Sequence, residues 1–141
     1  MSATVHATCV AIDGRAILLM GKPGSGKSDL ALRLIDRGAR LVSDDGTIVT
    51  ARDDSLYASA PQTIAGKMEV RGLGILEVAT LDEARLALCI ALDEPVARMP
   101  DEDLPTMTIE GCTLPKLALA PFESSAPVKV EKALLLYGLK S

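Results

Sequence analysis

Short apolar runs separated by turn residues are the first pattern in this chain. Apolar and polar residues alternate over residues 4–12, and continuous apolar runs cover residues 16–20 and 86–92. Alternation with a period of two predicts a strand, and a short continuous apolar run predicts a strand buried on both faces. Asp13 and Gly14, between the first two runs, are a signal for a two-residue hairpin turn. The chain therefore predicts a β-hairpin at its start and a further buried strand near residue 90.

Weaker versions of the same patterns predict further strands and loops. Strands are expected at residues 40–43, 47–50, 56–60, 106–110 and 114–118. Charged residues and prolines predict solvated loops at residues 52–55 and 93–105, and a loop with one helical turn is expected at residues 62–68.

Two stretches have the periodicity of an amphipathic helix. Residues 29–37 place apolar side chains on one face, and Gly38 then favours a left-handed helix end. Residues 128–139 show the same spacing near the C-terminus. The apolar positions concerned are Leu30, Ala31, Leu34 and Ile35 in the first helix and Val130, Ala133, Leu134 and Tyr137 in the second.

A phosphate-binding motif lies between the strand at residues 16–20 and the first helix. Residues 21–28 fit G-x-x-x-x-G-K-[ST] without a mismatch, and a strand before and a helix after are the context that this motif requires. Glycines let successive N–H groups point at phosphate oxygens, and the helix adds its positive dipole end. Lys27 can reach the β- and γ-phosphates, and Ser28 can ligate Mg²⁺. The predicted phosphate-binding residues are Gly21, Lys22, Pro23, Gly24, Ser25, Gly26, Lys27 and Ser28.

Composition limits the class of protein. The 141 residues are 48% apolar and 24% charged, so residues 1–141 are predicted to form one globular domain. Aromatic residues make up 2% and the net charge is −4, which argues against nucleic-acid binding, because that needs a basic face and often stacking aromatics. No apolar stretch approaches the length of a membrane span and no leader segment is recognised, so a cytoplasmic protein without membrane contact is predicted.

Cys9, Cys89 and Cys112 are widely spaced and form no C-x-x-C pair. Their number and spacing predict neither a disulfide framework nor a zinc site. Buried free thiols are the expected state of all three.

Asp44 and Asp45 follow the strand predicted at residues 40–43. Ligands of open α/β sheets bind at the carboxyl ends of strands, and neighbouring side chains diverge there. One carboxylate could therefore face a metal ion and the other an acceptor hydroxyl, as phosphoryl transfer requires. The alternative is that Asp44, Asp45 and Gly46 form only a hairpin turn.

Glu69 and Arg71 have a similar ambiguity. In a strand the two side chains would share one face, so Glu69 could bind Mg²⁺ and Arg71 could balance phosphate charge. The alternative is that they form a surface ion pair. Gly72 and Gly74 favour a bend or a close backbone approach at this point. His6 is the only histidine, and a lone histidine is more often structural than catalytic.

Together these residues resemble the catalytic domain of the bifunctional HPr kinase/phosphorylase family. The matching segments are His6 with its strand, the loop at residues 21–28 with its helix, residues 37–45, and the E-x-R-G-L-G-I block within residues 68–75. Their order and spacing agree with the family over about residues 4–80. The resemblance implies an α/β fold of the P-loop kinase type, a mixed sheet with few helices, related to phosphoenolpyruvate carboxykinase.

The resemblance also implies a function. A member of this family uses ATP and Mg²⁺ to phosphorylate a regulatory serine of HPr, the phosphocarrier protein of the bacterial phosphotransferase system. Lys27 would hold the transferring phosphate, and Ser28, Glu69 and Asp44 would bind Mg²⁺. Asp45, preferred over Asp44, would take the serine proton and return it during phosphorolysis. Arg71 would assist, and His6 would lie beside the site.

The family is hexameric, so a homo-oligomer is expected, and the chain resembles a short form without the family's N-terminal domain. Two segments depart from the family pattern: residues 79–84 replace a glycine-rich segment, and residues 124–127 replace a G-R-N turn. Arg98 is a loose match to an arginine of the family's later loop. These departures bear on phosphorylase activity and oligomerisation and leave the phosphate and metal residues intact.

Two other functions remain open from the residues alone. One is a small-molecule kinase or nucleoside triphosphatase, although the absence of an N-K-x-D segment argues against a GTPase. The other is a nucleotide-binding regulatory module without catalysis.

Overall fold

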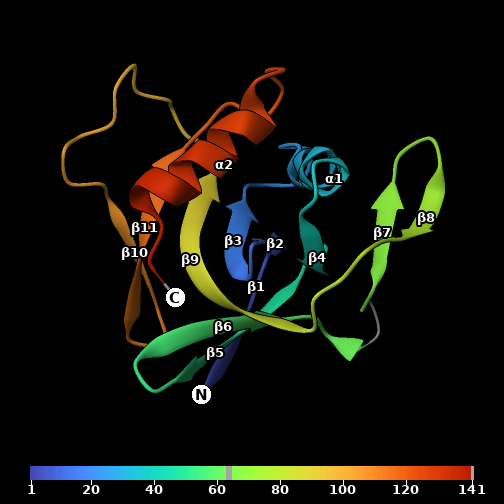
Figure 1. The fold of residues 1–141 in the computed structure, drawn as a ribbon, viewed down its shortest axis with the longest axis horizontal. Coiled ribbons are helices and arrows are strands. Elements are labelled where there is room, and N and C mark those ends of the chain that lie inside the picture. Colours follow the sequence, from blue (N-terminus) through green and yellow to red (C-terminus); the bar gives the residue numbers. More distant parts are fainter. Residues whose placement is uncertain (63–64, 141) are drawn as a thin grey trace.

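The apolar run near residue 90 forms β9 (Glu83–Ala91), which lies at the centre of the sheet in the computed structural model (Figure 1). The structure describes residues 1–62 and 65–140. One edge of β9 pairs in parallel with β3 (Arg15–Met20). The other edge is shared, since β6 (Ser55–Ser59) pairs antiparallel near its start and β11 (Cys112–Ala118) pairs in parallel near its end. The sheet therefore divides at β9 and curls.

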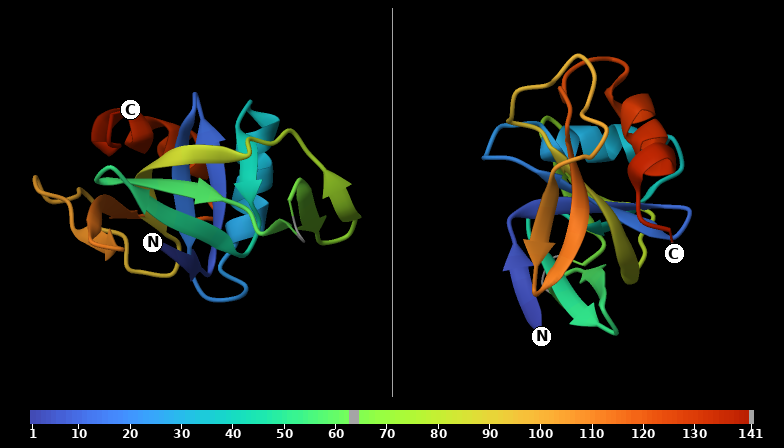
Figure 2. Two further views of the ribbon diagram at one scale, coloured as in Figure 1. Left: turned by 90° about the horizontal axis from the view of Figure 1, so that it is seen from below. Right: turned by 90° about the vertical axis from the view of Figure 1, so that its left-hand side faces the viewer.

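The remaining strands extend the sheet on both sides of β9. The strand order is β1-β5-β6-β9-β3-β2-β4, with β10 attached through β11 and a separate hairpin formed by β7 and β8. Figure 2 shows the β10–β11 pair (orange) and the β5–β6 pair (green) from two further sides. The bounds are β1 Ser2–Val5, β2 Ala7–Ile12, β4 Arg40–Ser43, β5 Thr47–Arg52, β7 Lys67–Val70, β8 Gly74–Glu77, β10 Thr106–Ile109, α1 Lys27–Asp36 and α2 Ala126–Tyr137.

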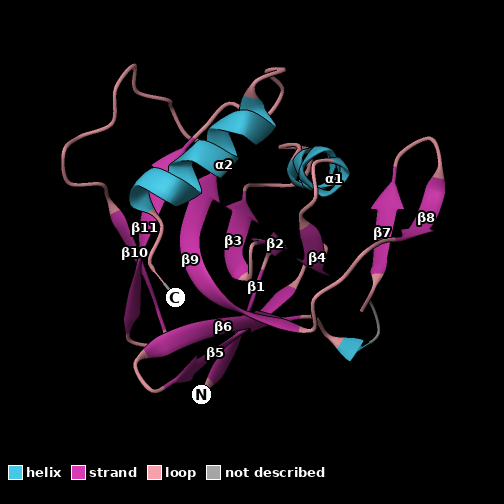
Figure 3. Ribbon diagram, in the orientation of Figure 1, coloured by secondary structure: helices cyan, strands magenta, loops and turns pink. Residues whose placement is uncertain are grey.

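The core lies on both faces of the central strands, which explains their continuous apolar sequences. Ile17 and Leu19 of β3 belong to a cluster beneath α1 and α2, whereas Ala16 and Leu18 belong to a cluster enclosed by the curled strands. Figure 3 shows both helices on one side of the central strands. Burial on both faces is typical of strands with parallel neighbours. The predicted mixed sheet with few helices is confirmed.

Most predicted elements are present. Asp13 and Gly14 form the β2–β3 turn, with φ of 51° and 82°, the positive values that a two-residue hairpin turn requires. The first predicted helix is α1, and the second is α2, which begins two residues earlier than predicted and ends at Tyr137. The predicted loop at residues 62–68 includes residues 63–64, which lie outside the described part of the chain, and β7 already begins at Lys67.

The prediction of one strand over residues 4–12 is wrong, because the chain bends at His6. β1 pairs with β5 on one branch of the sheet, whereas β2 pairs with β3 and β4 on the other. Alternation continues across the bend, so the pattern of polar and apolar residues does not reveal it. The bend brings the start of β2 opposite Met20, the residue before the phosphate loop.

Among the described residues, no helix is long and apolar enough to cross a membrane.

The structure predicts different reactivities for the three free cysteines. Cys9 and Cys89 are buried, as expected, whereas Cys112 is partly exposed, so the expectation of burial is wrong for Cys112. Burial raises the pKa of the Cys9 thiol, and it raises the pKa of Cys89 to about 12. Because the thiolate is the reactive form, Cys9 and Cys89 should be almost unreactive near pH 8.

A titration with a chromogenic disulfide reagent at pH 8 should therefore detect one fast thiol in the native protein and three in denaturant. Replacing Cys112 with serine should remove the fast phase. Rapid reaction of all three thiols under native conditions would contradict the burial of Cys9 and Cys89.

Candidate functional site

The phosphate loop joins the carboxyl end of β3 to α1. Gly24 and Gly26 have φ of 86° and 94°, a region that favours glycine. A Cβ at Gly21 would lie 2.3 Å from Ser25 Oγ, so the loop can close this tightly only with glycine at that position. Lys27 Nζ donates to the carbonyl of Gly21 at 2.7 Å and lies largely buried inside the curve of the loop. The loop, its lysine and the helix N-terminus thus form an anion-binding concavity.

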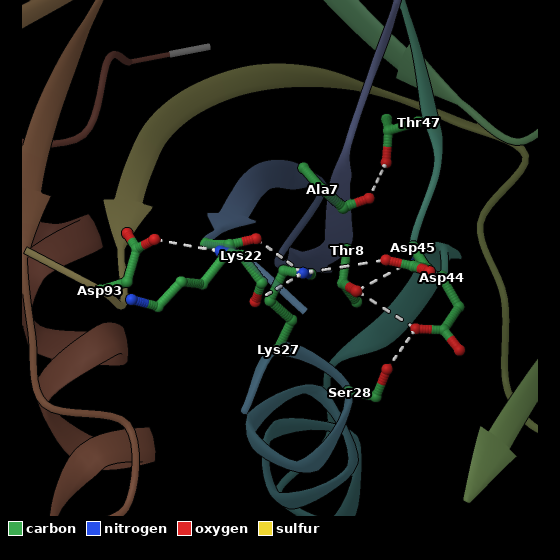
Figure 4. Close-up of polar contacts among 10 residues, drawn as sticks. Ala7, Thr8, Lys22, Lys27, Ser28, Asp44, Asp45, Thr47 and Asp93 are labelled. Carbon is green, nitrogen blue, oxygen red and sulfur yellow. Dashed lines mark hydrogen bonds and ion pairs between the residues drawn. The ribbon is translucent and has the colours of Figure 1, made fainter. Parts of the chain in front are cut away.

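Asp44, at the end of β4, lies directly opposite the start of α1. Its Oδ1 accepts a hydrogen bond from Ser28 Oγ at 2.7 Å and another from Thr8 Oγ1 at 3.1 Å (Figure 4). Its Oδ2 accepts a longer hydrogen bond, 3.3 Å, from the backbone N–H of Glu69 in β7. One carboxylate therefore connects β2, β4, β7 and α1.

Asp45 points in a different direction from Asp44. Its backbone has a left-handed φ of 58°, and its Oδ1 lies 3.8 Å from Lys27 Nζ. Its side chain is 73% exposed, so it can reach a group that approaches from solvent. Within the described part of the chain β4 and β5 do not pair, so the alternative that Asp44, Asp45 and Gly46 form only a hairpin turn is wrong.

Thr8 holds both aspartates, and the sequence analysis missed it. The side chain is fully buried in β2, and its single hydroxyl donates to Asp44 Oδ1 and accepts the N–H of Asp45 at 3.1 Å. This pair of hydrogen bonds fixes where the two carboxylates diverge. A threonine within a predicted strand was the only signal in the sequence, and the alternation of that strand indicates no role for it.

The β7–β8 hairpin closes the other side of the site. Glu69 lies in β7 but Arg71 lies in the hairpin turn, so the prediction that they share one strand face is wrong. Gly72 and Gly74 have φ of 91° and 105°, which accounts for the expected bend. No ion pair joins Glu69 to Arg71 among the described residues. Both instead line a cavity of about 540 Å³, whose other lining residues are Ser28, Asp29, Leu32, Val70, Gly72 and Gly74.

His6 and Arg98 are placed differently. His6 is exposed at the bend before β2, next to Ala7, which pairs with Met20. It therefore stands at the edge of the sheet from which the phosphate loop emerges. Arg98 lines a different cavity of about 450 Å³, between the loop at residues 93–105 and α2.

Comparison with known proteins finds a matching family, a similar solved structure and similar sequences. The sequence profile of the family described as "HPr Serine kinase C-terminal domain" matches residues 1–119. A solved structure of the Hpr(Ser) kinase/phosphatase from Coxiella burnetii is similar with a TM-score of 0.81 and 30% identity, covering 94% of each chain. The chain belongs to the HPr serine kinase C-terminal domain family.

Curated relatives carry the name HPr kinase/phosphorylase. The Limosilactobacillus reuteri protein is 36% identical over 146 residues, which cover 94% of this chain and 43% of that protein. The Peptoclostridium acidaminophilum protein is 49% identical over 81 residues, 57% of this chain and 26% of the relative. The chain thus spans less than half the length of the curated relatives that it matches.

A second residue that the sequence analysis missed, Asp93, lies on the other side of the phosphate loop of this HPr kinase-family chain. Asp93 follows β9, and its Oδ2 accepts the N–H of Lys22 at 3.0 Å (Figure 4). β9 is parallel to β3, so their carboxyl ends meet at the same edge. An aspartate directly after a buried strand was the available signal, but the proline-rich sequence that follows assigned it to a loop.

The oxygen donors of the site suit Mg²⁺. Ser28 and Asp44 supply a hydroxyl and a carboxylate, and Glu69 lies at the same cavity. Within residues 1–62 and 65–140, no group of three or more His, Cys, Asp and Glu side chains is assembled for a metal. Mg²⁺ typically uses one or two carboxylates together with substrate phosphates and waters, so this set fits a magnesium nucleotide better than a free metal ion.

Replacing Thr8 with valine should destabilise the protein by about 1–3 kcal/mol, because a carboxylate loses a buried donor and the N–H of Asp45 loses its acceptor. Urea unfolding measures this change. Thr8→Ser keeps the hydroxyl and is the matched control, with an expected cost of about 1 kcal/mol for the lost methyl group. Equal stability of Thr8→Val and the native protein would show that the hydroxyl does not hold the aspartates.

Proposed function

We propose that the chain is a kinase that uses ATP and Mg²⁺ to phosphorylate a serine of HPr. The observation that carries this proposal is that the two aspartates contact different groups of the phosphate loop and α1. Asp44 binds the hydroxyl of Ser28, and Asp45 lies 3.8 Å from the phosphate-loop lysine. The names of the relatives, HPr kinase/phosphorylase and Hpr(Ser) kinase/phosphatase, supply the acceptor protein and its serine.

The phosphate loop would hold the nucleotide. Lys27 donates to loop carbonyls in this structure and can turn its ammonium group to the β- and γ-phosphates. Ser28, Asp44 and Glu69 would hold Mg²⁺. When bound, ATP and Mg²⁺ supply the phosphoryl group and neutralise its negative charge.

Asp45 would act as the general base. Its exposed carboxylate accepts the proton of the serine hydroxyl while the serine oxygen forms its bond to the phosphoryl group and the bond to ADP breaks. For phosphorolysis the same carboxylate returns the proton to the serine as orthophosphate takes the phosphoryl group. Its distance from Lys27 keeps the base beside the transferring group. Arg71, at the rim of the cavity, would balance phosphate charge, and His6 would border the acceptor.

Phosphorylase activity, assembly into a hexamer and a cytoplasmic location are further parts of this proposal. They come from the family resemblance, and the relatives' names include the phosphorylase.

Incubation with γ-labelled ATP, Mg²⁺ and HPr should transfer label to a serine of HPr. Mass spectrometry of HPr identifies the residue, and a variant of HPr with alanine at that serine is the control. Label released only as free phosphate would point to a triphosphatase, and tight ATP binding without turnover would point to a regulatory module. Either result would overturn the proposed kinase.

Replacing Asp45 with asparagine should lower the rate of transfer by about 10²–10⁴-fold, because the base is lost, while ATP affinity changes little. The matched control is Asp53→Asn, since Asp53 also has a left-handed φ, 51° against 58°, but lies in the β5–β6 turn. Full transfer activity in Asp45→Asn would move the base to another residue.

Lys27→Ala should weaken both nucleotide binding and turnover.

A further inference from the structure

Phe122, the only phenylalanine of the chain, lies against the phosphate loop. A Cβ at Gly26 would come within 2.9 Å and 3.0 Å of two atoms of the Phe122 ring and within 3.3 Å of Pro121. The ring therefore packs on the backbone of Gly26, the residue that caps α1. Even so, Phe122 is 70% exposed, so most of its surface remains without a partner.

The segment that carries Phe122 is fixed on both sides of the ring. Arg33 of α1 donates to the carbonyl of Pro121 and to that of Glu123, the latter at 3.1 Å. Asp29 holds the same guanidinium at 2.9 Å. Glu123 also accepts from Lys129 of α2 at 2.8 Å. The segment that carries the exposed ring is thus attached to α1 and α2. The ring is therefore held beside the loop although most of it is not buried.

The ring stands on the opposite side of the loop from the proposed metal site. At 3.6 residues per turn, positions 26 and 33 share one face of α1, and Ser28 lies on about the opposite face. Ser28 faces Asp44 at 2.7 Å, whereas Phe122 and Arg33 lie on the other side. Asp29 lies between the two sides, since it pairs with Arg33 and also lines the cavity of Ser28 and Glu69. The same division appears in the sheet, since Asp44 follows β4 on one side of β3, and Phe122 comes after β11 beyond β9 on the other.

The proposed reaction sets the direction of a nucleoside triphosphate at this loop. The terminal phosphate must face Asp45 and Ser28, so the rest of the molecule runs towards the side of Phe122. We infer that Phe122 is the platform on which the base of the nucleotide stacks. This inference rests on the proposed function and adds to it a binding residue for the nucleoside.

The chemistry of the ring suits this role. A purine offers a large π-face, and offset stacking on an aromatic side chain contributes to binding without reading particular base edges. Aromatic residues make up only 2% of the chain, and it has no tryptophan. Its one phenylalanine is nevertheless exposed beside the phosphate loop. The competing role is that the ring only supports the backbone of Gly26. Loss of that support would weaken the binding of every ligand of the loop to the same extent.

Inorganic triphosphate separates the two roles, because it occupies the phosphate loop and has no base. Calorimetry with Mg²⁺ should show that Phe122→Ala binds ATP about 5- to 100-fold more weakly than the native protein, the range expected for one lost stacking contact. Its affinity for inorganic triphosphate should stay within about twofold of the native value. Leu135→Ala is the matched control, since Leu135 is 68% exposed on α2 and outside the loop, and both affinities should be unchanged.

Phe122→Trp gives a second readout. It keeps an aromatic platform and introduces the chain's only tryptophan, so ATP affinity should remain near the native value. ATP should quench the tryptophan fluorescence, and inorganic triphosphate should leave it unchanged.

Three results would overturn the inference. Equal weakening of ATP and triphosphate binding in Phe122→Ala would assign the ring to loop support. Native ATP affinity in Phe122→Ala would show that the base binds elsewhere, with the proposed kinase function intact. Failure of the native protein to bind either ligand would refute the proposed function and the inference together.

Discussion

β3 is paired along both edges, with β2 on one side and β9 on the other, and both of its faces are buried. A strand held in this way cannot slip by one residue without moving its apolar side chains from one half of the core to the other. Its carboxyl end is therefore fixed in space, and the phosphate loop starts from that fixed point. The rest of the site depends on this constraint, because each further group is placed relative to the end of β3.

Different groups are delivered to the two sides of that point. On one side, β2 and β4 bring Thr8, Asp44 and Asp45, and on the other β9 brings Asp93 to the N–H of Lys22. Charged groups that are held before a ligand arrives need no reorganisation during reaction, which is how such sites gain most of their effect. Thr8 is important here because one buried hydroxyl orients a carboxylate and satisfies the N–H of a residue with a left-handed backbone.

Two segments that are expected to depart from the family pattern, residues 79–84 and 124–127, have defined surroundings in the described part of the chain. Residues 79–81 run along β4, where the N–H of Leu41 donates to Ala79 at 2.8 Å and the N–H of Leu81 donates to Leu41 at 3.0 Å. This segment covers the edge of the strand that carries Asp44. Near the C-terminus, residues 124–127 follow Glu123 and include the first two residues of α2. Residues 79–81 thus cover the strand that precedes Asp44, and residues 124–127 connect the segment of Phe122 to α2.

The sequence by itself determined the local features: the phosphate loop, its flanking strand and helix, the Asp13–Gly14 turn and the central strands. Each depends on contacts within a few residues, or on a periodicity that a strand or helix imposes directly. It also indicated Asp44 and Asp45, because they follow a strand end. Only the tertiary structure decided that the chain bends at His6 and that Arg71 leaves the strand of Glu69. It alone brought Thr8 to Asp44, Asp93 to Lys22 and Phe122 to Gly26. The residues of the first two pairs are separated by 36 and 71 positions, and those of the third by 96 (122 − 26 = 96). Such contacts depend on which strand edges pair and how the sheet curls, and no local pattern of residues specifies either.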